Sequence, residues 1–242
     1  MFFYSPYYYG FDWTYLVLVL PCLILSLWAS ASVKSTFRRY SQQYSQRRIT
    51  GADAAERVLR NNGVHNVRIE RVAGDLTDHF DPRTNVIRLS DSVYGSTSTA
   101  AIGVACHEAG HAVQYAKHYA PIRLRAAIIP ITNIGSKLAM PLILLGIVLS
   151  FLGNLSYTLV YLGIACFALS LVFQLITLPV EFNASRRAIR AIDDAGILSS
   201  QELIGAKKTL RAAAMTYVAA TATALAQLLR LIVLFGGRRR RD

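Results

Sequence analysis

Charged residues and cysteines are scarce in this sequence of 242 residues. Only 17% of the residues are Asp, Glu, Lys or Arg, whereas 53% are hydrophobic, and the mean hydropathy is positive. Such a composition is unusual for a soluble protein and indicates a membrane protein. The three cysteines are an odd number, and Cys22 and Cys166 fall inside apolar runs, so the sequence predicts no disulfide framework.

Acidic residues are also few, because Asp and Glu total 14 against 26 Lys and Arg, which gives a net charge of +12. A basic surplus of this size can serve nucleic acid, anionic lipid or membrane orientation. The basic residues gather near the ends of apolar segments, at 34–48, 186–190, 207–211 and 238–241. This placement predicts contact with the lipid bilayer and argues against a nucleic-acid partner.

The first apolar segment, residues 13–33, carries no charge and is long enough to cross a hydrocarbon core of about 30 Å at about 1.5 Å per residue. Five basic residues follow by Arg48, and none precedes the segment. We therefore interpret residues 1–33 as an uncleaved transmembrane anchor with its N-terminus outside. An aromatic cluster lies at the outer interface: Tyr4, Tyr7, Tyr8, Tyr9, Phe11 and Trp13.

A cytoplasmic module over residues 34–125 is expected next. Thr50 and Asp53 predict a capping box for a short helix that Gly63 ends. Residues 66–72 and 85–90 are rich in β-branched side chains and predict a small β-hairpin or sheet. The second strand could be an ordinary paired strand or an open edge to which an extended peptide adds.

Two long apolar segments, 126–152 and 156–178, follow the module, with Lys137 their only charged residue. The turn between them is uncharged and both outer ends are basic, which predicts a transmembrane hairpin over residues 126–178 with both ends in the cytoplasm. Residues 179–211 are then expected on the cytoplasmic side, together with the module at 34–125.

The C-terminal part, residues 212–242, contains an apolar run at 213–235 and ends in a basic tail. The run is long enough to cross a membrane, but it includes Gln227 and Arg230. Both a fourth span and an apolar helix that does not cross the bilayer therefore remain open.

The segment "GVACHEAGHAVQYA", residues 103–116, carries the chemistry of the chain. On a helix, residues four apart lie on one face, so His107 and His111 can bind one zinc ion. Glu108 is rotated by about 100° from His107, which suits a general base acting on water bound to the metal. The flanking residues are small, as expected where helices pack closely around a site, which favours a metal site over two structural histidines.

A catalytic zinc needs a third protein ligand. The metzincin pattern fails, because it requires Gly at 114 and His at 117, where this chain has Gln114 and Lys117. His118 lies about 10 Å along the helix from His111, too far to join the same ion. An intramembrane protease ranks second, since this helix is bounded by polar residues. The candidate is Glu181, because the hairpin brings both of its ends back together; we expect it beside Pro179, where a helix begins.

The chain resembles the gluzincin membrane metalloproteases of the HtpX and CAAX prenyl protease type, and more closely the bacterial YugP-type membrane zinc metallopeptidases. The motifs that carry the resemblance are "TDHFDPRTNVIRLS", "VACHEAGHAVQ", "LPVEFNASRRA" and "TYVAATATALAQLLRL". The resemblance implies a mainly α integral membrane protein with a small α+β cytoplasmic gluzincin-like catalytic module. It also implies one Zn²⁺ held by His107, His111 and Glu181, with Glu108 as base and proton shuttle.

The chain departs from the wider gluzincin pattern at Ser185, where an acidic residue would orient a ligating histidine. The orienting group must then be Ser185 itself, the amide of Asn183, or a more distant carboxylate such as Asp193 or Asp194. Tyr217 and Arg186 are the candidate donors to the oxyanion.

The expected function is a zinc-dependent endopeptidase, multi-pass in the bacterial inner (plasma) membrane, with its active site on the cytoplasmic side. Its expected partners are polypeptide substrates, membrane proteins among them as a candidate class, and the lipid bilayer. The alternative is a catalytically weak or inactive zinc-binding scaffold. Cys106 cannot easily provide a fourth ligand, because it lies about 100° around the helix from His107.

Overall fold

The computed structural model describes residues 12–236. Most of the N-terminal aromatic cluster and the run of arginines at 238–241 lie outside the described residues. The described chain forms two compact units. The helical unit contains residues 12–28, 127–175 and 218–236, and the site unit contains residues 29–126 and 176–217.

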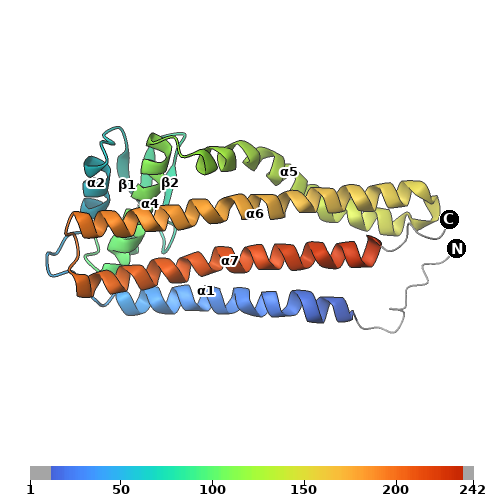
Figure 1. The fold of residues 1–242 in the computed structure, drawn as a ribbon, viewed down its shortest axis with the longest axis horizontal. Coiled ribbons are helices and arrows are strands. Elements are labelled where there is room, and N and C mark those ends of the chain that lie inside the picture. The colour runs from blue at the N-terminus through green and yellow to red at the C-terminus, as the bar shows by residue number, and fades with distance from the viewer. Residues whose placement is uncertain (1–11, 237–242) are drawn as a thin grey trace. The chain divides into compact units, whose positions relative to one another are not determined.

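Four helices in the described part of the chain are long and apolar enough to cross a membrane. Figure 1 shows α6 and α7 as continuous helices. The first of the four begins as a π-helix and continues as α1, and the others are α5, α6 and α7: Tyr15–Tyr40, Ala120–Val148, Asn154–Asp194 and Ser200–Gly236. The described residues therefore support a membrane protein.

The apolar run 213–235, for which the sequence leaves a fourth span open, lies within α7. Its one arginine, Arg230, is paired with a carboxylate. Arg230 Nε donates to Asp12 Oδ2 at 3.0 Å, and the guanidinium carbon lies 5.4 Å from the centre of the Tyr15 ring. A charged side chain in a spanning helix is tolerated when it is paired in this way. Arg230 is thus compatible with a fourth span.

Close backbone contact between α5 and α6 stabilises the helical unit. A Cβ atom added to Gly163 would lie 2.8 Å from the carbonyl oxygen of Ala139, and one added to Gly146 would lie 2.8 Å from that of Ser156. Ser156 Oγ in turn donates to the carbonyl of Gly146 at 2.6 Å. Small residues and buried hydroxyls of this kind are typical of helix packing in membranes.

The site unit begins with helix α2 (Gly51–Asn61), whose predicted capping box is confirmed. Thr50 Oγ1 accepts from the backbone N–H of Asp53, and the Asp53 carboxylate accepts from that of Thr50. Gly63 follows the helix with a φ of 73°, a conformation that glycine adopts without steric cost. Helix α4 (Thr99–Ala116) is capped by Ser98, whose side chain accepts from the backbone N–H of Ala101.

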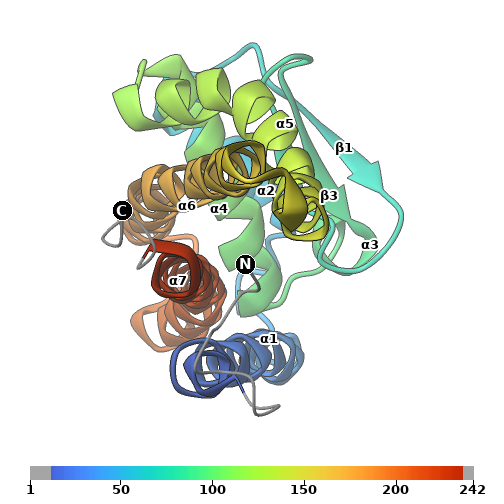
Figure 2. The ribbon, with the colours of Figure 1, turned by 90° about the vertical axis from the view of Figure 1, so that its right-hand side faces the viewer.

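Three strands form one sheet in the order β1-β3-β2: Arg68–Val72 (β1), His79–Asp81 (β2) and Val86–Ser90 (β3). The two predicted strands, β1 and β3, lie side by side and are parallel, so they do not form a hairpin with each other (Figure 2). The hairpin partner of β3 is β2, which the sequence analysis missed.

Of the two options open for residues 85–90, the structure shows the ordinary paired strand, because β3 is the central strand and is paired on both sides. Its residues Val86, Ile87, Leu89 and Ser90 are buried, which agrees with a central strand covered on both faces. After β3 comes the short helix α3 (Asp91–Tyr94), and α4 then packs against β2.

The expected start of a helix at Glu181 is wrong. Helix α6 runs without interruption from Asn154 to Asp194, with Pro179 inside it. A proline in a helix interior removes only one backbone hydrogen bond. The apolar stretch before Pro179 and the polar segment after it both follow the helical repeat, so the helix continues through the proline. Glu181 therefore lies well inside a long helix.

Candidate metal centre

The site is built where α4 crosses α6 and α7 at close range. A Cβ atom added to Gly110 would lie 2.8 Å from the backbone oxygen of Ala184 in α6. One added to Gly103 would lie 3.2 Å from the Cα of Ala206 in α7. The small residues around the HEAGH motif thus permit this close packing, as the sequence analysis expected.

Three side chains from these helices converge on one point. His107 Nε2 lies 3.2 Å from Glu181 Oε2, and His111 Nε2 lies 3.5 Å from the same oxygen. The three potential ligand atoms all lie within 4.8 Å of one another. Two ligand atoms on a tetrahedral zinc ion are about 3.3 Å apart, given bond lengths of about 2.0–2.1 Å. The donor set and its spacing therefore fit zinc.

The hydrogen bonds around Gln114 determine the tautomer of His111. Arg187 only donates, so its Nε bond of 2.7 Å identifies Asn183 Oδ1 as an acceptor. Gln114 Nε2 donates to that oxygen at 3.0 Å and to the carbonyl of Val180 at 2.9 Å. Gln114 Oε1, 3.0 Å from His111 Nδ1, must then accept a proton from the ring. His111 consequently keeps the lone pair of Nε2 for a metal.

Ser185 is the hydrogen-bond partner of Nδ1 in His107, as Gln114 is in His111. Its Oγ lies 3.1 Å from His107 Nδ1, so the hydroxyl can accept the ring proton and leave Nε2 free. Because a hydroxyl can also donate, this contact constrains His107 less than Gln114 constrains His111. Asp193 and Asp194, the distant alternatives, are exposed near the end of α6.

The Glu181 carboxylate uses its two oxygens for different partners. Arg125 Nη1 donates to Oε1 at 2.7 Å, while Oε2 faces both histidines. The hydroxyl of Tyr217 is also hydrogen-bonded to this carboxylate. With Glu181 only 4% exposed, these contacts hold the carboxylate in a single orientation that suits one-oxygen binding of a metal.

Glu108 lies beside the three ligands and is itself buried, with 8% of its surface exposed. The pKa of its carboxyl is raised to about 7, chiefly by burial and also by the negative charges of Glu181 and Asp78, while His107 and a backbone N–H bond from Phe80 act in the opposite direction. The bond from Phe80 ties Glu108 to strand β2, so β2 is the strand of the sheet that borders the site.

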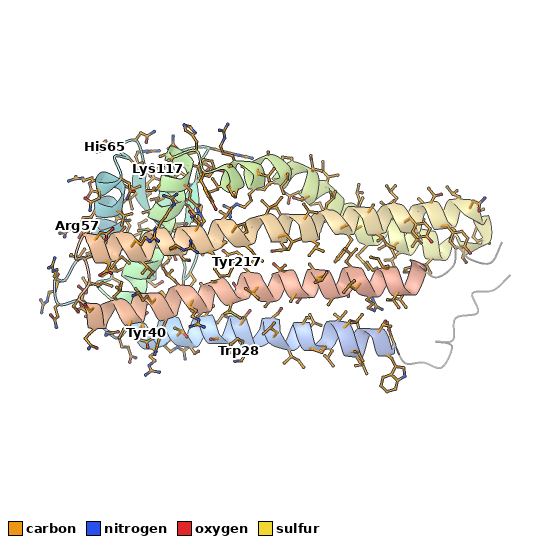
Figure 3. The ribbon with its side chains drawn as sticks, viewed as in Figure 1. Trp28, Tyr40, Arg57, His65, Lys117 and Tyr217 are labelled. Atoms are coloured by element: carbon orange, nitrogen blue, oxygen red, sulfur yellow. The ribbon has the colours of Figure 1, made fainter. Side chains whose placement is uncertain are left out.

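A cavity of about 370 Å³ opens onto these groups. It is lined by His107, Glu108, Glu181 and Tyr217, the last of which is labelled on α7 in Figure 3. Side chains from α1 form part of its wall. Arg186, the other oxyanion candidate, does not line this cavity and lies on a neighbouring groove instead.

Two residues named in the sequence analysis lie away from the site, as expected. Cys106 is fully buried in the core, where burial raises the pKa of its thiol, and His118 is exposed. Asn183 reaches a histidine only through Gln114.

Sequence reasoning missed Gln114 and Arg125. Gln114 is three residues after His111, so helical spacing alone could have indicated that the two are neighbours. For Arg125 no local signal exists, because its partner Glu181 is 56 positions away.

The comparisons with known proteins agree with this chemistry. The family described as "Putative neutral zinc metallopeptidase" matches residues 15–236. The chain is 46% identical over 221 residues to a Bacillus subtilis (strain 168) protein named "Putative membrane protease YugP". The aligned region covers 91% of this chain and 96% of that protein. No solved structure matches.

Proposed function

The chain belongs to this YugP-type family of zinc metallopeptidases, and on that premise we propose that it is a membrane-bound endopeptidase that uses one zinc ion per chain. The observation that carries the proposal is the convergence of His107, His111 and Glu181 on one point. Glu108 lies beside them and lines one cavity together with His107 and Glu181. Three protein ligands and a position left for water are the arrangement of a catalytic zinc site, whereas structural sites commonly close all four positions.

His107 Nε2, His111 Nε2 and Glu181 Oε2 would hold the metal. When bound, zinc supplies a water of lowered pKa and polarises the peptide carbonyl. Glu108 would take the proton from the attacking water and deliver it to the leaving amine. Its burial and the backbone bond from Phe80 hold the carboxyl in place for both transfers.

Tyr217 is the oxyanion donor that we propose. Its hydroxyl is hydrogen-bonded to Glu181 and lines the cavity, so a small rotation could direct the hydroxyl at a carbonyl bound near the metal. Arg186 is a weaker candidate, because it lines the neighbouring groove.

We place the enzyme in the bacterial inner membrane as a multi-pass protein with the site facing the cytoplasm. The basic clusters that flank the apolar helices support this orientation. The module boundaries given by the sequence, 34–125 and 179–211 around the hairpin 126–178, are proposed with it. The substrates would be polypeptides, membrane proteins among them, and no nucleic-acid partner is proposed.

The experiment that tests this function compares cleavage of an unfolded casein-like substrate by the detergent-purified, zinc-loaded protein and by Glu108→Gln. We expect cleavage only by the wild type, with equal zinc content in both proteins by metal analysis. Glu56→Gln is the matched control, because Glu56 is exposed on α2 and pairs only with Arg60. It should cleave like the wild type.

The alternative, a zinc-binding scaffold, makes a different prediction. A scaffold would leave the substrate intact in all three proteins while each retains one zinc. Equal cleavage by wild type and Glu108→Gln would refute the role of Glu108.

A further inference from the structure

A second groove, of about 400 Å³, lies between α6 and α7 in the site unit. Four basic side chains line it, two from each helix: Arg186, Arg190, Lys207 and Arg211. Its apolar surface includes Ile189 and Leu210. Ser185 lines both this groove and the cavity of the metal centre, so the two are neighbours.

The four cations are unpaired in the described part of the chain, although Asp193 and Asp194 follow Arg190 within about one turn of α6. All four are exposed, and none makes an ion pair or a hydrogen bond there. Arg125 and Arg230, by contrast, are both paired with carboxylates. Like charges four residues apart on a helix repel, and the groove contains one such pair on α6 and one on α7. An anion is therefore the ligand that this groove fits.

The position of these basic residues along α6 and α7 indicates which kind of anion binds. Arg186 is six residues beyond Val180, where the apolar stretch of α6 ends, and six residues of helix span about 9 Å. Arg211 lies two residues before the apolar run of α7 that begins at residue 213. The headgroup layer extends roughly 5–8 Å beyond the hydrocarbon core on each side, and long basic side chains reach toward it. These cations thus come to the level of lipid phosphates.

The apolar part of the groove agrees with a lipid. Among its apolar lining residues, Leu210 is only 4% exposed and Phe182 is 43% exposed. Exposed cations together with an apolar lining match a phosphate attached to a glycerol and acyl chain better than they match a free phosphate ion. We infer that the groove between α6 and α7 binds the phosphate of an anionic phospholipid headgroup, beside the metal centre and independently of its activity.

The test measures phosphatidylglycerol binding to the full chain in phosphatidylcholine-containing micelles by native mass spectrometry. The variant is Lys207→Gln/Arg211→Gln. The matched control is Lys208→Gln/Arg57→Gln, which removes the same charge from two exposed residues outside the groove. Lys208 follows Lys207 in the sequence, and Arg57 lies on α2, where Figure 3 labels it.

Each cation near an anionic headgroup contributes roughly fivefold in affinity, so the groove variant should lose about 25-fold. The control should lose less than about twofold. Lys207→Arg/Arg211→Lys should bind like the wild type, and a thermal unfolding curve measured on each variant identifies a folding defect.

Three results would overturn the inference: equal losses in the groove variant and the control, no preference of the wild type for phosphatidylglycerol over phosphatidylcholine, or full displacement of the lipid by millimolar inorganic phosphate. The last would identify the ligand as free phosphate. Because binding is read without substrate, failure here leaves the proposed peptidase function unaffected.

Discussion

Replacement of Gln114 by leucine should weaken zinc binding without altering any ligand. The leucine has a similar volume, but it removes the acceptor that lies 3.0 Å from His111 Nδ1. Loss of an outer hydrogen-bond partner typically reduces metal affinity 10–100-fold, or about 1.4–2.7 kcal/mol. We expect the upper part of that range, because Gln114 is fully buried and no bulk water can replace its oxygen.

The measurement is competition for zinc between the apo-protein and a chromophoric chelator at neutral pH, with thermal unfolding of the apo-protein beside it. Thr99→Val is the matched control, because Thr99 is fully buried on the same helix and its hydroxyl bonds only with Tyr40 and Gln43. Both variants should lose roughly 1–3 kcal/mol of stability through unsatisfied polar groups, but only Gln114→Leu should lose zinc affinity. Wild-type affinity in Gln114→Leu, or an equal loss in Thr99→Val, would refute the reasoning.

Two further predictions concern packing and charge. Gly110→Val should lower the free energy of unfolding by about 1–3 kcal/mol in a denaturant titration and weaken zinc binding, because its Cβ would lie 2.8 Å from the backbone oxygen of Ala184. The control is Gly95→Val, which should be close to neutral because nothing lies within 4 Å of the added Cβ. Asp12→Asn should destabilise the protein in detergent by roughly 1–3 kcal/mol, because it leaves Arg230 without its carboxylate. Asp12→Asn/Arg230→Met should recover most of that loss, and a double variant no more stable than the single one would contradict the ion-pair explanation.

Local pattern predicted much of the site and the fold. Helical spacing alone places His107 and His111 on one face and Glu108 on the adjacent face. The length of the apolar segments alone predicts the long helices. The capping box at Thr50 was also predictable, because capping depends on residues within one turn of each other.

Long-range packing decided the rest. Hydropathy gave no indication that residues 68–72 pair in parallel with 86–90, or that α6 continues through Pro179, because strand order and helix length depend on what the neighbouring elements bury. The roles of Arg125 and Gln114 arise only when α5 and α6 meet α4. That meeting requires Gly110 to touch the backbone at Ala184, a contact between residues 74 positions apart that no local pattern encodes.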